Sequence, residues 1–176
     1  MLTRKGPVAN HSEVTVSIDP ALHGLGVGLW RGTELVWGGY IPRPKGTDTR
    51  GPGAWLALSQ ALRTTLDGWT IDYVVVELMQ FYKPGQGHAK RGAAEDLLEL
   101  NGVSGACVGA LHPRLGATGY LPAEWKGQVA TTAMATRVRM HIDRHGWTQV
   151  VDWTGTKKDE DIAHGIGLGL HHLGIR

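Results

Sequence analysis

The sequence predicts an α/β domain in which a mixed sheet carries helices on both of its faces. Three observations lead to this class. The first quarter of the chain contains three consecutive strand patterns. The short apolar run DYVVVEL, residues 72–78, is typical of a strand that is buried on both faces. Helical and strand patterns then alternate, which gives the order β-β-β-α-β-α-β-α-α of an α/β domain.

The N-terminal strands are predicted from composition and from one tight turn. Residues 14–19, VTVSID, are mostly β-branched or apolar, and the Asp-Pro pair at 19–20 is expected to end this strand. Residues 25–31 and 34–41 flank a short Gly-Thr connection, as the two strands of a hairpin do. We therefore expect one strand followed by an antiparallel hairpin.

Helices are predicted where apolar residues recur at intervals of three or four. Such patterns cover residues 53–66, 92–111, 126–144 and 159–172. The third pattern places four apolar residues on one face: Val129, Ala133, Val138 and Ile142. Two extended pieces complete the prediction, ATGYLP at 117–122, which its proline ends, and QVVDW at 149–153.

Length and composition favour a single soluble domain. The 176 residues fit one domain, 1–176, of which residues 1–12 are expected to form a flexible N-terminal segment. No apolar run approaches the roughly 20 residues that cross a bilayer, and no signal-peptide pattern opens the chain, so we expect a cytoplasmic protein. The single cysteine, Cys107, excludes an internal disulfide framework and an all-cysteine metal site.

The charge distribution permits a polyanionic partner. The net charge is +2, and basic residues gather in two glycine- and proline-rich segments, 41–53 and 81–92. The residues concerned are Arg43, Lys45, Arg50, Lys83, Lys90 and Arg91. Basic loops on a scaffold are a common way to hold phosphates, although ordinary solubilising charge explains them equally well.

Three acids stand at the ends of predicted elements. Asp19 ends the first strand, Glu77 ends the buried strand, and Asp161 opens the last helix with His164 on the same helix face. If both strands are central neighbours, these side chains meet at one sheet edge. Clustered carboxylates repel one another unless a cation binds them, and oxygen ligands suit Mg²⁺ or Mn²⁺. The alternative roles are a turn residue for Asp19, a surface residue for Glu77 and a helix N-cap for Asp161. An acid that ends the apolar run VVVE is, however, hard to explain as a solubilising surface residue.

Five segments resemble, in order and with similar spacing, those of the RuvC-type Holliday junction resolvases. They are SIDPALHGLGVGLW, VVVELMQFY, AEDLLELNGVSGACVGAL, LPAEWKGQV and KKDEDIAHGIGLGLHH. The resemblance spans residues 14–172. It implies an RNase H-like fold with a mixed five-stranded sheet and helices on both faces. It further implies a metal-dependent, structure-selective DNA endonuclease that resolves four-way junctions by paired phosphodiester hydrolysis, with two Mg²⁺ or Mn²⁺ ions in each site.

The resemblance also implies roles for residues near the C-terminus. Asp161 matches the first acid of the closing helix and His164 the second, where the family more often has aspartate. An alternative register places Lys158 on the first acid position and Asp161 on the second. In the preferred register Asp159 and Glu160 are solvated flanking residues.

The implied site and partners complete the expectation. The catalytic residues are Asp19, Glu77, Asp161, His164 and Lys126, and all of these except Lys126 are metal ligands. DNA is contacted by Phe81, Tyr82, Lys83, Lys90, Arg91 and Lys126. We expect a homodimer through helix 92–111, because this helix has apolar residues on more faces than one sheet contact can cover. The expected location is the nucleoid, or the host cytoplasm if the protein is viral.

Other functions remain open from the sequence. A non-catalytic or differently specific nucleic-acid-binding protein of the same fold, acting on branched DNA, flaps or hybrids, is one alternative, and in it His164 would mark decay of the site. His141 and His145 lie one turn apart and suggest zinc, but no acid or cysteine completes a convincing ligand set. Trp125 is expected in the core, with Lys126 directed toward phosphate.

Overall fold

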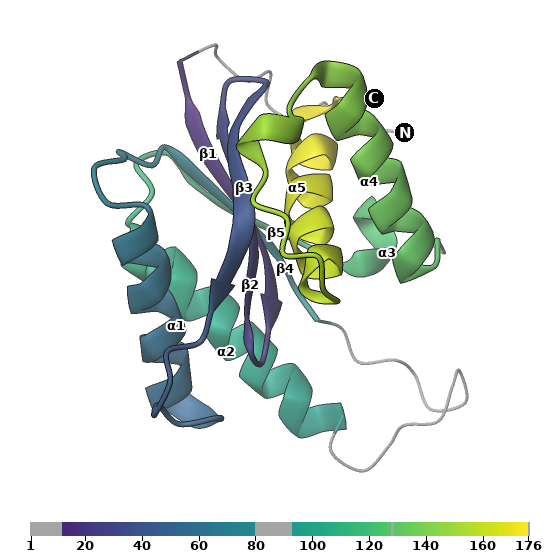
Figure 1. Cartoon of the computed structure of the whole chain (residues 1–176). Coiled ribbons are helices and arrows are strands. Elements are labelled where there is room, and N and C mark those ends of the chain that lie inside the picture. The colour runs from purple at the N-terminus through teal and green to yellow at the C-terminus, as the bar shows by residue number, and fades with distance from the viewer. Residues whose placement is uncertain (1–11, 80–92, 128, 176) are drawn as a thin grey trace, which may run out of the picture.

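The computed structural model describes residues 12–79, 93–127 and 129–175. Its centre is a five-stranded sheet of order β3-β2-β1-β4-β5 (Figure 1). The strands are β1 (Val14–Ala21), β2 (Gly24–Arg31), β3 (Glu34–Pro42), β4 (Tyr73–Glu77) and β5 (Gly116–Tyr120). The first three pair antiparallel, whereas β4 pairs parallel with β1 and β5 pairs parallel with β4. The predicted mixed sheet is confirmed.

Helices cover both faces of this sheet, as predicted (Figure 1). They are α1 (Gly51–Thr65), α2 (Ala93–Leu111), α3 (Pro122–Trp125), α4 (Thr131–His145) and α5 (Lys158–Leu173), with a 3-10 turn at Thr148–Val150. On one face, α1 and α2 bury side chains such as Leu58 and Val103 against the strands. On the other, α5 lies on the sheet and α4 packs outside it through Val138 and Ile142. Among the described residues, no helix has the length and hydropathy to span a membrane.

Glycines let α5 approach the sheet closely. A Cβ atom at Gly26 in β2 would overlap the backbone of Asp161, and one at Gly165 in α5 would overlap the backbone of Gly26. Helix and strand backbones therefore meet without an intervening side chain. This contact fixes the first two turns of α5, and with them Asp161 and His164, against the strand that neighbours β1.

The predicted helix over 126–144 is wrong in its first turn. The structure instead has the short α3, which ends before Lys126, and a separate α4 that begins at Thr131. Gly127 has a φ of 60°, a left-handed conformation that turns the chain between the two helices. Val129 consequently precedes α4, and Ala133 is exposed, whereas Val138 and Ile142 are buried as expected.

Two strand predictions also need correction. The first strand does not end at the Asp-Pro pair but continues through Pro20 to Ala21. Proline is tolerated there because β1 pairs with β4 only as far as Ile18, so the missing proline N–H lies where β1 pairs only with β2. The segment predicted as extended at 149–153 begins with the 3-10 turn, and only Val151 pairs, with Gly38 of β3.

Candidate functional site

The end of β1 and the end of β4 bring the predicted acids together. Ile18 pairs with Val76, so Asp19 and Glu77 follow at the same edge of neighbouring parallel strands. These two acids line an open cleft of about 430 Å³ together with Asp161 and His164 of α5. The other lining residues are Pro20, Ala21, Leu22, His23, Met79, Leu100, Lys126 and Thr131. All five residues predicted as catalytic therefore meet in one cleft.

Glu77 is held from two sides. Its side chain is 2% exposed, and its Oε2 accepts a 2.6 Å hydrogen bond from the indole Nε1 of Trp125. The Nζ of Lys126 lies 3.3 Å from each carboxylate oxygen. Burial and the negative charge of Asp19 raise the pKa of Glu77, while Lys126 and the Trp125 hydrogen bond lower it, and the net direction is upward.

His164 connects the acids to α4. Its Nδ1 lies 3.4 Å from Oδ2 of Asp19, and its Nε2 lies 3.3 Å from the backbone oxygen of Thr131. Burial lowers the pKa of His164, but the hydrogen bond and charge of Asp19 outweigh it, so the pKa is raised. In the neutral ring, a proton on Nε2 satisfies the Thr131 carbonyl and leaves the Nδ1 lone pair facing Asp19, which is the arrangement of a histidine ligand.

Asp161 shares this unfavourable environment. Burial is the largest cause and the charge of Asp19 the next, and together they raise the pKa of Asp161 to about 6, against a smaller lowering by His164. The negative charge of Asp19 thus repels the carboxylates of both Glu77 and Asp161, and a bound cation would reduce the repulsion in each of these two pairs.

The donor set fits a hard divalent cation, but the side chains are not yet gathered around one. Within the described ranges, no three histidine, cysteine or acidic side chains already stand at metal-binding geometry. The positive charges beside Glu77 and Asp19 are instead Lys126 and, when protonated, His164. Three carboxylates and one imidazole can supply the oxygen and nitrogen ligands of Mg²⁺ or Mn²⁺ once Lys126 withdraws and His164 gives up its extra proton.

The repulsion predicts a measurable effect on the metal-free protein. An acid whose folded pKa is raised gains stability as pH falls, because the folded state takes up the proton first. Asp161→Asn removes the cost of the charged form, so it should stabilise the protein near pH 8 by about 1 kcal/mol after allowance for solvent screening. The gain should shrink as pH falls through about 6, the folded pKa, and vanish near 4. Urea unfolding in chelator at several pH values measures it, and a gain that does not depend on pH would contradict this origin.

The prediction that Asp159 is solvated is wrong. The carboxylate is buried and accepts hydrogen bonds from the backbone N–H and hydroxyl of Thr154, both at 2.7 Å, and from the backbone N–H of Gly155 at 3.2 Å. Arg139 of α4 pairs with it at 3.0 Å. Burial raises the pKa of Asp159, but these bonds outweigh it and the pKa is lowered. Asp159 therefore fastens the loop before α5 and does not line the cleft.

The placement of Lys158 bears on the two possible registers. Lys158 is exposed, and its Nζ lies 4.8 Å from the ring centroid of Tyr40, outside the residues that line the cleft. Asp161 and His164 both line it. The geometry therefore agrees with Asp161 as the first acid position and His164 as the second, while their role as ligands stays a prediction.

Most of the predicted DNA contacts lie outside the described residues. These are Phe81, Tyr82, Lys83, Lys90 and Arg91. Just before them, the backbone N–H and C=O of Met79 are both bonded by the side chain of Asn101 in α2, at 3.1 and 3.3 Å. No pattern in the sequence predicts this contact, which anchors Met79 at the cleft.

The basic segment 41–53 is engaged in structural contacts. The guanidinium of Arg43 donates to the carbonyls of Leu22 and Thr49. Arg50 forms ion pairs with Glu95 and Asp96 of α2. These two arginines hold the loop to the hairpin and to α2, so the segment offers less free charge than its sequence suggests.

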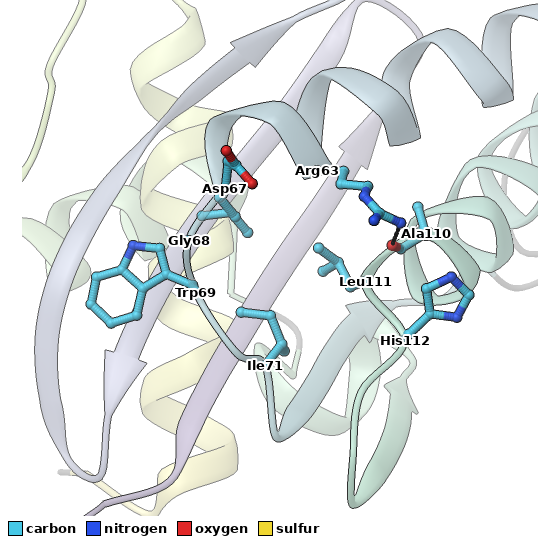
Figure 2. A pocket seen from close by; sticks show the side chains of 9 residues that line it. Arg63, Asp67, Gly68, Trp69, Ile71, Ala110, Leu111 and His112 are labelled. Carbon is cyan, nitrogen blue, oxygen red and sulfur yellow. Dashed lines mark hydrogen bonds between the residues drawn. The ribbon is translucent and has the colours of Figure 1, made fainter.

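Two further features lie away from the cleft. His141 and His145 stack at 6.2 Å between ring centroids, and within the described part of the chain no acid or cysteine joins them as a metal site. Figure 2 shows a pocket of about 220 Å³ at the C-terminal ends of α1 and α2, where Arg63 donates to the carbonyl of Ala110. It adjoins the start of β4, whereas Asp19 and Glu77 lie near the C-terminal ends of β1 and β4.

Comparisons with known proteins agree in fold. No protein-family model matches the sequence, and no curated protein does. Thermus thermophilus RuvC in complex with a Holliday junction substrate is similar in structure, with a TM-score of 0.61 and 18% identity over 91% of this chain and 92% of that one. A second structure of Thermus thermophilus RuvC has a TM-score of 0.56 and 19% identity, over 90% of this chain and 92% of that one. The yeast mitochondrial Holliday junction resolvase Ydc2 has a TM-score of 0.54 and 13% identity, over 95% of this chain and 81% of that one.

These likenesses cover between 90% and 95% of this chain and between 81% and 92% of the other chains. Identity between 13% and 19% shows a shared fold and leaves the chemistry to the residues of this chain. The chain thus has the RNase H-like α/β fold of the RuvC-type Holliday junction resolvases.

Proposed function

We propose that this protein is a metal-dependent endonuclease that cuts branched DNA, with the four-way junction as its substrate. The observation that carries the proposal is the cleft in which Asp19, Glu77, Asp161 and His164 meet on a resolvase fold. The Holliday junction substrate bound in the similar RuvC complex supports the choice of DNA structure.

Each residue has a part in hydrolysis. Asp19, Glu77 and Asp161 would hold the ions through carboxylate oxygens and His164 through Nδ1. Two such ions supply the positive charge that stabilises the attacking and leaving oxygens of a phosphodiester displacement. Water adds at phosphorus and one P–O ester bond breaks, which leaves a phosphate on one end and a hydroxyl on the other. Lys126, whose side chain is 16% exposed, brings a cation to the cleft that can pair with the phosphate.

A second candidate keeps the fold and loses the chemistry. His164 stands where the resembling family more often has aspartate, so a binder of branched DNA without cleavage, or a nuclease for flaps or hybrids, would use the same surface. The buried Glu77 favours an enzyme, because burying this carboxylate beside Asp19 destabilises the fold, and a protein that only binds DNA does not need such a pair.

The experiment that separates these functions compares substrates under defined metal conditions. End-labelled four-way junction, flap and linear duplex of matched sequence are incubated with Mg²⁺, with Mn²⁺ or with chelator. We expect paired nicks in the junction with either metal, and binding alone in chelator. Binding without nicks in any metal would support the non-catalytic alternative, and preferential cutting of the flap would reassign the substrate.

A homodimer through α2 forms part of the proposal. Much of the surplus apolar surface predicted for this helix is covered, since Val103 and Cys107 lie in the core and Trp55 of α1 packs against Gly102. What remains is Leu98, 65% exposed, on the helix side that also carries Gly105 and Gly109. Open space surrounds both glycines, so a second helix could approach closely there. A two-fold dimer would present two identical sites for paired nicks.

Leu98→Lys is expected to weaken this dimer. A charge in an apolar helix contact remains unpaired, which should shift the monomer–dimer midpoint by about tenfold or more in sedimentation. Leu56→Lys is the matched control, because Leu56 is similarly exposed, at 56%, on α1. Equal behaviour of the two variants, or a parent that is monomeric while it cuts junctions fully, would remove α2 as the interface.

A further inference from the structure

Trp125 is buried in contact with two of the four proposed ligands. Its side chain belongs to a small core cluster with Val75 and Leu168, and the residue is 8% exposed. The indole Nε1 donates to Oε2 of Glu77 at 2.6 Å, and the indole ring meets the ring of His164 edge-on, with centroids 5.8 Å apart. What sets this tryptophan apart is that the carboxylate it meets is a proposed ligand that lines the cleft.

The indole has little freedom to move. On one side, a Cβ atom at Gly167 would lie 3.0 Å from the ring, so α5 makes room for it with a glycine. On another, the ring packs with the buried side chains of Val75 and Leu168. Its N–H direction is therefore fixed by packing and not by the carboxylate that it meets.

The two donors to Glu77 differ in how easily they leave. Lys126 lines the cleft with a long, flexible type of side chain, and both of its contacts to Glu77 are long, at 3.3 Å. The Trp125 contact is short and enclosed. When a cation reaches Glu77, the lysine can swing away while the indole N–H keeps Oε2 in place.

We propose that Trp125 is a positioning residue that presets the Glu77 carboxylate for the metal ion, and this inference rests on the proposed function. Its N–H occupies one lone pair of Oε2 and so fixes which oxygen and which direction Glu77 offers to the cleft. Its ring sets the position of His164 at the same time. Groups that orient metal ligands in this way typically change metal affinity or activity by about 10–100-fold when removed.

Trp125→Phe tests this role by keeping an aromatic ring and removing the N–H. We expect the Mn²⁺ concentration at half-maximal cleavage to rise about tenfold, with junction affinity in chelator unchanged. The second readout needs no DNA: the Mn²⁺ titration of thermal stability should shift its midpoint by the same factor. Trp147→Phe is the matched control, because Trp147 is equally buried and donates at 2.7 Å to a carboxylate far from the cleft, that of Glu34.

The outcomes separate this inference from the proposed function. Parent-like Mn²⁺ midpoints in Trp125→Phe, or the same shift in Trp147→Phe, overturn the role of Trp125 and leave the nuclease intact. A parent whose stability and activity do not respond to Mn²⁺ overturns the metal site and this role with it. If Trp125→Phe does not fold, a benzothienylalanine at position 125 keeps the bicyclic shape and replaces only the N–H by sulfur, and the same shift is expected.

Discussion

Asp19→Asn is expected to reduce junction cleavage by about a thousandfold, a loss of roughly 4 kcal/mol of transition-state stabilisation. Asp19 is the acid that the other site residues share. It raises the pKa of Glu77, Asp161 and His164, and its Oδ2 faces the Nδ1 of His164. Asparagine keeps the shape of the side chain but has no charge with which to hold a cation.

The same substitution should leave junction binding in chelator unchanged or slightly tighter. Removing a negative charge from the cleft weakens its repulsion of phosphate. Asp67→Asn serves as the control, since Asp67 is an exposed aspartate beside the pocket of Figure 2. Cleavage and binding are measured on the same labelled junction, and thermal unfolding verifies the fold. Full cleavage by Asp19→Asn would refute the assignment of the site.

The convergence of the acids could be predicted because it depends on strands. β-branched and apolar runs locate β1 and β4 to within about two residues, and parallel neighbours bring residues such as Asp19 and Glu77 to one edge. The close packing of α5 against β2 likewise depends on glycines that are visible in the sequence, Gly165 and Gly26. Patterns of this kind are local in sequence, so they survive into the folded state.

The contacts that hold the site could not be predicted in the same way. The bond between Trp125 and Glu77 joins residues 48 positions apart, and the bond from His164 to Thr131 joins residues 33 apart. Both depend on the break between α3 and α4 at Gly127, where helical periodicity predicted a continuous helix. Asp159 was misjudged for a related reason, because the residues that bury it come from a loop and from α4.

His164→Ala is expected to lower cleavage by about 10–100-fold, and His164→Asp to restore it with Mg²⁺. The Nε2 of His164 lies toward the Thr131 carbonyl, a contact that can orient the ring of a metal ligand, and its Nδ1 lies toward Asp19. Imidazole is a softer donor than carboxylate, so Mn²⁺ should serve the parent at least as well as Mg²⁺. Aspartate should reverse that preference.

The pH dependence gives an independent test of the same residue. A histidine ligand must be neutral, and the raised pKa of His164 means that its proton competes with the cation at a higher pH than for a free imidazole. Parent cleavage should therefore fall as pH drops toward about 6, and the fall in His164→Asp should begin at lower pH. Rates are compared at saturating junction and several metal concentrations. If the proton and the metal ion compete for His164, excess metal should move the acid side of the parent's pH profile to lower pH. If His164→Ala matches the parent under both metals and at every pH, the three carboxylates alone hold the ions and His164 only supports Asp19.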